Sequence, residues 1–303
     1  MSRWFKAVLL LVILSLLLPP NVGLAQEQPA APQQEDVPAA DLSPAAVTDT
    51  PETLVTDPMG SYTIVSPKIF WQSLVQANCD PDENVKTWDD VIRRIAVQGS
   101  PIRTLYSEES QGSQCGPGVS SNVLSDGNYV YFVKGTFQRL PVTANPGDAA
   151  ESTAGDMNDY AEMVQYGSFI YVLTETKGLW RVDKSAFTAT QLRSAAQVGA
   201  NPHQFQTDGE FLFWITGGRL RQMRLSNNAI ADFAPTGVTN YTFSSDLCFI
   251  QPCSPDSRVY MGVANRIDRY KAVDRTFDQM IFTAASANDR FDEMVVSGSN
   301  LFF

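Results

Sequence analysis

Two short acidic stretches carry the side chains in this sequence that are best suited to chemistry. Each brings three carboxylates together within a few residues, and a histidine lies between the stretches: Asp156, Asp159, Glu162, His203, Asp289, Asp292 and Glu293. Neighbouring carboxylates can hold a calcium ion, bind a sugar or pair with a basic peptide. The same residues could instead form an acidic surface that contacts only water, which is the simpler interpretation.

Other catalytic chemistry finds little support in the sequence. His203 is the only histidine, so a Ser-His-Asp hydrolase would have to use it, yet no G-x-S-x-G motif is present. Residues 80–84 begin like a calcium-binding loop, but Val85 and Val91 stand where an EF-hand needs Gly and Glu. The glycines of residues 116–118 lack the lysine of a phosphate-binding loop. We therefore predict no catalytic residue and no cofactor, with calcium in another oxygen site left open.

The charge of the chain excludes two classes of partner. The formal net charge is −11, whereas binding to a nucleic-acid backbone requires clustered Lys and Arg. Attraction to anionic lipid is disfavoured for the same reason. The acidity lies partly in residues 26–67, which contain acidic residues and no Lys or Arg.

The amino terminus has the layout of a secretory signal peptide. Arg3 and Lys6 precede an apolar run at residues 7–18, and small residues follow at Gly23 and Ala25. The run is shorter than the roughly 20 residues that span a bilayer. We predict cleavage after Ala25, no membrane span afterwards, and a secreted or extracytoplasmic protein, in the periplasm or outside the cell.

Residues 26–59 are rich in Pro, Ala and acidic residues and poor in apolar ones. Such a segment buries too little surface to offset the entropy of ordering it. We expect a disordered linker.

The rest of the chain contains an internal repeat. A turn followed by an apolar strand recurs with markers at Gly127, Gly167, Gly209, Ser257 and Gly298, which lie 40, 42, 48 and 41 residues apart. A weaker copy begins at Ser66-Pro67. Repeats of this length, each made of short strands, predict an all-β fold, a β-propeller of four-stranded blades over residues 60–303. Six partial blades are visible, the last one incomplete.

Each half of the repeat has a physical reason. Gly, Asp and Asn tolerate the positive φ angles of a tight hairpin turn. The strand after the turn is apolar on both faces, as expected for a strand packed between two neighbouring sheets.

A basic residue also recurs one strand later. It is Arg94, Arg139, Arg181 and Arg269 in four blades, while another blade reads Leu220-Arg221-Gln222-Met223. An anion site is one interpretation. We favour a structural role, in which the arginine stem packs at the boundary between blades.

These residues resemble the extracytoplasmic bacterial β-propellers of the TolB-like and YWTD types, in which a Φ-x-x-DG-x-ΦYΦ unit opens each blade. The resemblance covers residues 60–303, although the segment Phe213-Trp214-Ile215-Thr216 is only near the YWTD motif. It implies a binding or scaffold module that recognises a protein, a glycan or another envelope component through one loop face. The alternative is a non-catalytic or substrate-gating propeller of a secreted hydrolase whose catalytic domain lies beyond residue 303.

The blade layout also makes a prediction for the four cysteines. Cys79 would lie between the second and third strands of the first blade, and Cys115 in the connection to the next blade, on the same face. Since exported proteins tolerate disulfides, we expect a Cys79–Cys115 bond clamping an insertion at residues 77–90, and a local Cys248–Cys253 bond. A four-cysteine metal site is the rival, but it lacks C-x-x-C spacing.

The last residues, 301–303, fall inside an apolar strand with no further strand to cover it. An uncovered strand of this kind is a poor edge for a stable sheet. We therefore expect the sequence to be a fragment of a longer protein, truncated at its carboxyl end.

Overall fold

Antiparallel strands account for almost all of the regular structure. The computed structural model describes residues 61–78, 86–96, 101–112, 121–244, 258–286, 291, 294–297 and 300–303, within a compact unit spanning Asp57–Phe303. The predicted signal peptide and linker, all four cysteines, and Asp289, Asp292 and Glu293 lie outside the described residues. Those predictions remain untested.

The strands form five four-stranded sheets and one two-stranded sheet, each built from strands consecutive in the chain. We call them blades one to six. Blades one to three contain the strands β1 (Tyr62–Val65), β2 (Lys68–Asn78), β3 (Lys86–Ala96), β4 (Arg103–Gly112), β5 (Leu124–Ser125), β6 (Tyr129–Lys134), β7 (Thr136–Pro141), β8 (Glu151–Ser152), β9 (Ala161–Tyr166), β10 (Phe169–Thr174), β11 (Gly178–Asp183) and β12 (Thr188–Arg193).

A single helical turn, α2 (Ala195–Val198), precedes blade four. Blades four to six contain the strands β13 (His203–Thr207), β14 (Phe211–Thr216), β15 (Arg219–Arg224), β16 (Ile230–Asp232), β17 (Val238–Phe243), β18 (Arg258–Val263), β19 (Arg266–Lys271), β20 (Phe277–Thr283), β21 (Val295–Ser297) and β22 (Asn300–Phe302).

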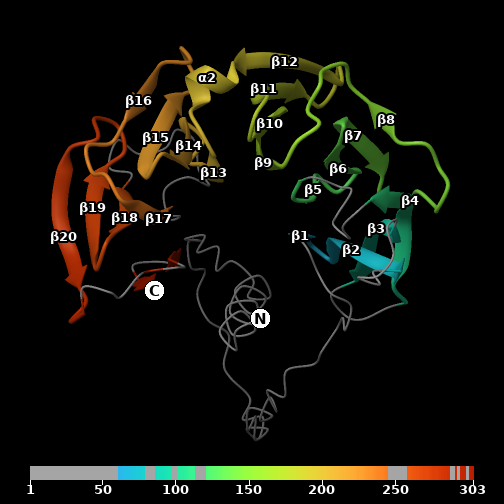
Figure 1. The fold of residues 1–303 in the computed structure, drawn as a ribbon, viewed down its shortest axis with the longest axis horizontal. Coiled ribbons are helices and arrows are strands. Elements are labelled where there is room, and N and C mark those ends of the chain that lie inside the picture. Colours follow the sequence, from blue (N-terminus) through green and yellow to red (C-terminus); the bar gives the residue numbers. More distant parts are fainter. Residues whose placement is uncertain are drawn as a thin grey trace, which may run out of the picture. The chain divides into compact units, whose positions relative to one another are not determined.

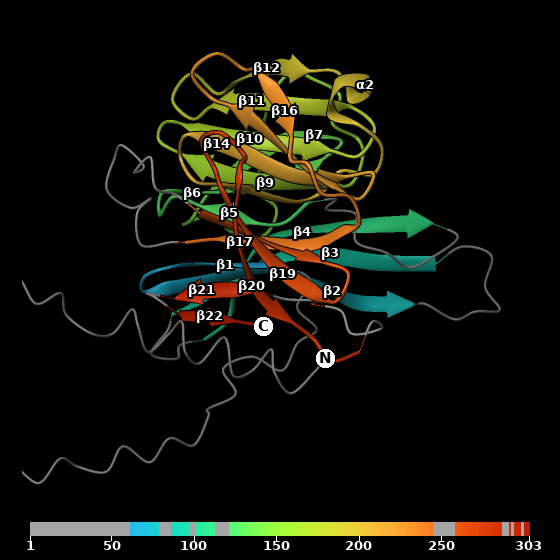
Figure 2. The same ribbon diagram turned by 90° about the vertical axis from the view of Figure 1, so that its left-hand side faces the viewer.

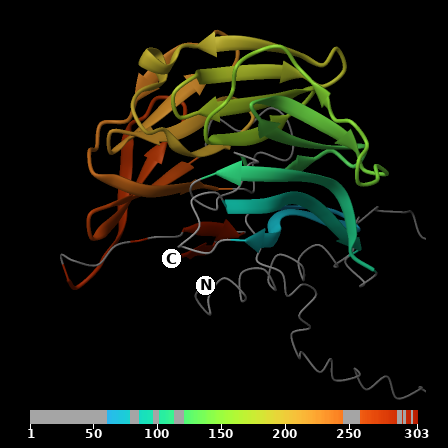
Figure 3. The ribbon, with the colours of Figure 1, turned by 45° about the vertical axis from the view of Figure 1, so that its right-hand side comes forward.

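The blades are arranged radially. The first strand of one blade contacts the first strand of the next for β1 and β5, β5 and β9, β9 and β13, and β17 and β21, while β17 also contacts β14 and β15. Figure 1 shows successive blades following one another around an arc, with these first strands on its inner side and outer strands such as β12, β16 and β20 on the outside. Figure 2 turns blades four and five toward the viewer, and Figure 3 brings blades one and two forward. The fold is a β-propeller, which confirms the predicted fold class.

In blades two to four, the second strand is the centre of the core. Its side chains alternate, so that one face packs on the preceding blade and the other on the following blade. Tyr131 and Val133 of β6 pack with Ile170 and Val172 of β10. All six residues of β14 are buried for the same reason. This confirms the interpretation of the apolar runs.

The turns before these strands also match the prediction. Asp126 Oδ1 accepts hydrogen bonds from two main-chain N–H groups further along the turn, each at 2.9 Å, and Asp208 Oδ1 does the same at 2.9 and 2.7 Å. Gly127 and Gly209 both have φ near 91°, which other residues rarely adopt. The sequence pattern therefore encodes one specific turn, used twice with the same hydrogen bonds.

Blade one carries the predicted extra residues as longer strands. β2 and β3 are each 11 residues long, and they continue to Asn78 and from Lys86. They pair beyond Ser73 and Val91, the positions that match the hairpin ends Thr174 and Gly178 of blade three. The described residues of the predicted insertion, 77–78 and 86–90, therefore lie in these strand extensions.

The recurring arginines occupy one register position. Each pairs across the sheet with the third residue of the preceding strand, and blade four has a glutamine there: Arg94 with Phe70, Arg139 with Tyr131, Arg181 with Tyr171, Gln222 with Phe213 and Arg269 with Tyr260.

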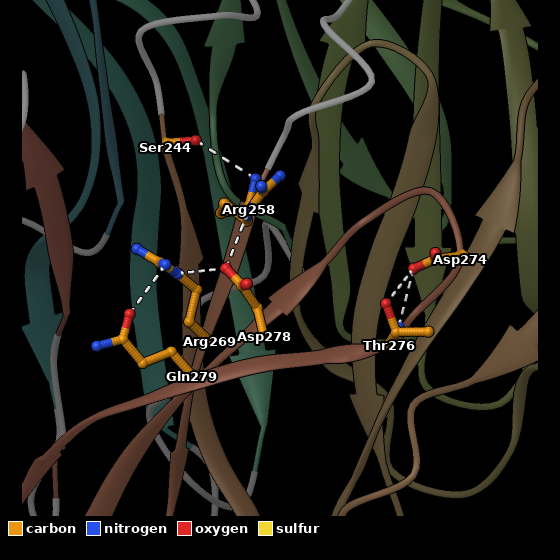
Figure 4. Close-up of polar contacts among 7 residues, drawn as sticks. All are labelled: Ser244, Arg258, Arg269, Asp274, Thr276, Asp278 and Gln279. Atoms are coloured by element: carbon orange, nitrogen blue, oxygen red, sulfur yellow. Dashed lines mark hydrogen bonds and ion pairs between the residues drawn. The ribbon is translucent and has the colours of Figure 1, made fainter.

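Two of these arginines differ in their contacts. Arg139 reaches blade three, where it donates to the Lys184 carbonyl at 2.8 Å and lies 4.0 Å from the Phe187 ring centre. Arg269 instead stays within blade five, where Asp278 of β20 accepts from it at 2.7 Å and from Arg258 at 3.1 Å (Figure 4). The expected position at a blade boundary is thus correct for Arg139, which also pairs with Glu151 of β8 at 2.7 Å. Arg269 contacts Asp278 and Gln279 of its own blade.

Candidate functional site

One face of the propeller carries the turns between second and third strands together with the connections from one blade to the next. We call it the loop face. Around blades two to four it consists of residues 135, 153–160, 175–177, 194–202 and 217–218. The four described candidates, Asp156, Asp159, Glu162 and His203, all lie on it or at its edge.

Asp156 and Asp159 attach the connection between blades two and three to the turn after β10. Asp159 Oδ2 accepts from the Thr176 N–H at 2.5 Å, and its Oδ1 accepts from the Tyr160 N–H at 2.8 Å. Asp156 Oδ2 lies 2.7 Å from Lys177 Nζ, and the lysine lowers the pKa of the Asp156 carboxyl. Both carboxylates therefore serve to hold the backbone of the loop face.

Glu162 performs a similar task between blades three and four. Its Oε1 accepts from the Gln204 N–H at 3.1 Å and its Oε2 from the Phe205 N–H at 2.5 Å. Gln204 has a φ of 56°, and the Tyr241 hydroxyl shares its one proton between the carbonyl oxygens of Gln204 and Phe213. The carboxylate thus stabilises an irregular start of β13.

Glu162 belongs to a series of polar contacts between first strands. Ser61 Oγ accepts from the Val123 N–H at 3.0 Å. Asn122 accepts from the Met163 N–H at 2.6 Å and donates to the Met163 carbonyl at 2.9 Å. Gln204 Nε2 donates to the Thr239 carbonyl at 3.3 Å. In each of blades one to four, a side chain at or next to the first strand therefore binds the main chain at or next to the first strand of the following blade. We call these the inner-strand contacts.

Sequence reasoning missed this series, although a signal was present. Asn122, Glu162 and Gln204 each stand five residues before a turn glycine, Gly127, Gly167 and Gly209. A polar residue at a constant distance from the turn, directly before an apolar one, marks the position.

Two exposed side chains lie next to the inner-strand contact that Glu162 makes. Tyr160 is 57% exposed, and His203 is exposed with its Nδ1 2.9 Å from the Asn201 carbonyl oxygen. They come from the starts of neighbouring first strands, β9 and β13, which Glu162 joins. The sequence predicted His203 as a candidate site residue but did not predict Tyr160.

An open hollow of about 640 Å³ lies beside this region, between the turn after β6 and residues 153–158. Thr153 lines it and is only 5% exposed, and its Oγ1 has no hydrogen-bond partner among the described residues. This oxygen is fully buried, so it faces the protein interior and a molecule in the open hollow would not reach it.

A polar cluster in which Asp90 and Tyr106 are buried and Glu108 is exposed joins blades one and two near the hollow. Lys134 Nζ lies 3.0 Å from Glu108 and 4.0 Å from Asp90, whose side chain is fully buried. The Tyr106 hydroxyl donates to Glu108, and this hydrogen bond together with Lys134 lowers the pKa of the Glu108 carboxyl. Burial and Glu108 in turn raise the pKa of the Tyr106 hydroxyl, so it stays protonated.

Within the described ranges, no three His, Cys, Asp or Glu side chains are grouped so that they could hold a metal ion. The part of the chain described also contains no helix long and apolar enough to cross a membrane.

Comparisons with known proteins provide information on the fold. No protein family and no curated protein matches the sequence. Among solved structures, the computationally designed Ika8 protein is similar with a TM-score of 0.51 and 7% identity, over 81% of this chain and 80% of that chain. At this level of identity the likeness concerns the fold alone.

Two further similarities are weaker. The extracellular domain of the putative hybrid two component system BT4673 from B. thetaiotaomicron has a TM-score of 0.47 and 10% identity, over 79% of this chain and 38% of that chain. The WD40 beta propeller domain of Doa1 has a TM-score of 0.36 and 9% identity, over 78% of this chain and 90% of that chain. What this β-propeller binds must therefore be inferred from its own residues.

Proposed function

We propose that this chain is an exported β-propeller that binds a component of the cell envelope or exterior, a protein or a glycan, through the loop face at blades two to four. The observation that carries the proposal is that Tyr160 and His203 are exposed next to main-chain segments which Asp159 and Glu162 hold by hydrogen bonds. Tyrosine provides a large amphipathic contact surface with few rotatable bonds, which suits recognition.

The hydrogen bonds and the ion pair of the three carboxylates favour binding over catalysis. Asp156 and Glu162 each use both oxygens on N–H groups or a lysine, and Asp159 uses both on main-chain N–H groups. A general acid or base must be able to exchange a proton with a substrate. These three residues instead position the loop face. Export is supported by the signal-peptide pattern of residues 1–25.

The experiment compares three forms of the full chain on immobilised neutral and acidic polysaccharides and on a panel of secreted and envelope proteins. One form is unchanged, one combines Tyr160→Ala with His203→Ala, and one carries Ser168→Ala in the turn after β9, on the opposite face. We expect at least one saturable interaction that the double variant weakens about tenfold or more, as for a central contact residue. Ser168→Ala should leave it unchanged. Interactions that survive the double change, or none at all, would contradict the proposal.

A further inference from the structure

We propose that Met280, on the outer strand of blade five, is a modification site at which peroxide oxidises this protein to methionine sulfoxide. Met280 lies in β20, the strand at the outer end of its sheet. Its side chain is 53% exposed. The site lies apart from the loop face and is independent of the ligand proposed there.

The exposure of Met280 distinguishes it from the other described methionines, each of which is at most 6% exposed. These pack in the apolar clusters between and within the blades: Met157, Met163, Met223, Met261 and Met294. Met1 and Met59 lie outside the described residues. An oxidant must reach the sulfur atom to react with it, so accessibility decides which methionine is oxidised. Among the described methionines, Met280 is therefore the one open to a peroxide in solution.

The pairing of β20 explains how Met280 comes to the surface. The register between β19 and β20 shifts twice, so that Met280 pairs with Asp268 and Phe277 pairs with Tyr270. Because these partners are two residues apart on β19, Met280 and Phe277 lie on the same face of the sheet although they are three residues apart. Phe277 is 56% exposed. The two side chains thus form a small apolar surface at the outer edge of blade five.

The sulfur atom also has a polar neighbour at this edge. The Thr283 hydroxyl donates a hydrogen bond to Met280 Sδ at 3.3 Å, and Thr283 is itself exposed. The contact holds the thioether beside a group that is in contact with solvent. Peroxide can therefore approach the sulfur without any movement of the core.

The reaction transfers one oxygen atom. The thioether sulfur attacks one oxygen of hydrogen peroxide, an S–O bond forms, and the O–O bond breaks. The departing hydroxide takes the proton from the oxygen that stays on sulfur and leaves as water. Sulfur is thereby oxidised by two electrons and the peroxide is reduced. The sulfoxide places a polar group beside Phe277, so the surface loses apolar character while the core keeps its packing.

The test treats the folded full chain with hydrogen peroxide and follows each methionine by mass spectrometry after digestion with trypsin. Residues 276–290 form a tryptic peptide in which Met280 is the only methionine. We expect this peptide to gain oxygen about tenfold faster than the peptides of the buried methionines, the ratio of 53% to 6% exposure. In urea that unfolds the chain, all methionines should react at similar rates, because unfolding exposes every sulfur atom.

Two variants test the effect on the surface. Met280→Leu removes the sulfur at similar volume, and Met223→Leu is the matched control, since it makes the same change at a fully buried position. Peroxide should shorten the retention of the unchanged chain and of Met223→Leu on a hydrophobic-interaction column. It should leave the retention of Met280→Leu unaltered, and the circular dichroism of all three should stay the same.

Oxidation of any of the five buried methionines as fast as Met280 in the folded chain would overturn the proposal. An equal retention shift in Met280→Leu would also contradict it, because the oxidised surface would then lie elsewhere. Loss of secondary structure when Met280 alone is oxidised would show that its side chain supports the core, which is incompatible with a surface modification site.

Discussion

Asp126 and Asp208 occupy equivalent turns, yet their pKa values shift in opposite directions. Partial burial disfavours ionisation of Asp126, but hydrogen bonds from the Tyr131 hydroxyl and two main-chain N–H groups outweigh it and lower the pKa. Burial dominates at Asp208 and raises the pKa, because its two N–H bonds offset only part of the effect. At the position of Tyr131, blade four has Phe213, which carries no hydroxyl.

The opposite shifts predict opposite pH dependences. A lowered folded pKa stabilises the native state above the unfolded value of about 4, and this stabilisation is lost as pH falls through the folded pKa. Asp126→Asn should therefore cost about 1 kcal/mol at pH 7 and less at pH 3. For the raised pKa of Asp208, ionisation opposes folding as pH rises, so Asp208→Asn should be relatively more favourable at pH 7 than at pH 3.

Urea unfolding of both variants at the two pH values measures this contrast. Each variant serves as the control for the other, since the turn and the substitution are the same. Parallel pH dependences would contradict the assignment of the shifts to the Tyr131 hydroxyl and to burial.

At the level of the strands, the inner-strand contacts link the first strand of one blade to that of the next by hydrogen bonds. Glu162 reaches across from β9 to two N–H groups at the start of β13. Buried N–H groups that lose their acceptor cost about 1–3 kcal/mol each. Loss of this contact should therefore change both hydrogen exchange at these amides and the free energy of unfolding of the protein.

We predict that Glu162→Ala lowers the free energy of unfolding by about 2 kcal/mol and that Glu162→Gln lowers it less, because the amide oxygen still accepts one N–H. Hydrogen exchange at the Gln204 and Phe205 amides should accelerate in Glu162→Ala. The control is Glu175→Ala, an exposed residue of the same face. Unchanged exchange at Gln204 and Phe205 would show that Glu162 does not hold β13.

The blades themselves were predictable from sequence, because turn glycines and two-sided apolar strands such as β14 recur at a nearly constant interval. The site was less predictable. Asp159 and Glu162 stand close together in sequence, but their partners Thr176 and Phe205 lie 17 and 43 residues further on. Partners that are main-chain groups leave no trace in residue type. The hydrogen bonds of Asp159 and Glu162 to main-chain groups could therefore not be predicted from the sequence.

At the scale of the whole molecule, blade six exposes apolar side chains among the described residues. Phe302 is 48% exposed and its partner across the hairpin, Val295, is 38% exposed. The residues equivalent to Phe302 in blades two and four, Tyr131 and Phe213, are 1% and 0% exposed because the following blade covers them. An apolar face of this kind promotes association.

We therefore expect the 303-residue chain to self-associate as its concentration rises. Phe302→Ser should shift analytical ultracentrifugation profiles toward monomer, since it removes the largest exposed side chain of that face. Ile102→Ser is the control, because Ile102 is 42% exposed in blade one. A chain that stays monomeric at all concentrations, or equal responses to both changes, would contradict this prediction.

Cleavage of the predicted signal peptide can also be tested on the whole chain. Expression with residues 1–25 intact should yield an exported protein whose amino-terminal residue is Gln26, as determined by mass spectrometry. Retention of residues 1–25 on the exported product would contradict cleavage after Ala25.

The repeated pairing of blade faces has an evolutionary consequence. Tyr131 and Val133 of blade two pack on Ile170 and Val172 of blade three, and Tyr171 and Leu173 pack in the same way on Leu212 and Trp214 of blade four. Blade two could therefore meet blade four directly if the segment between them were deleted. Gene duplication or loss of one unit would leave compatible neighbours on both sides. Descendants of such a chain can change the number of blades in single steps without inventing a new interface.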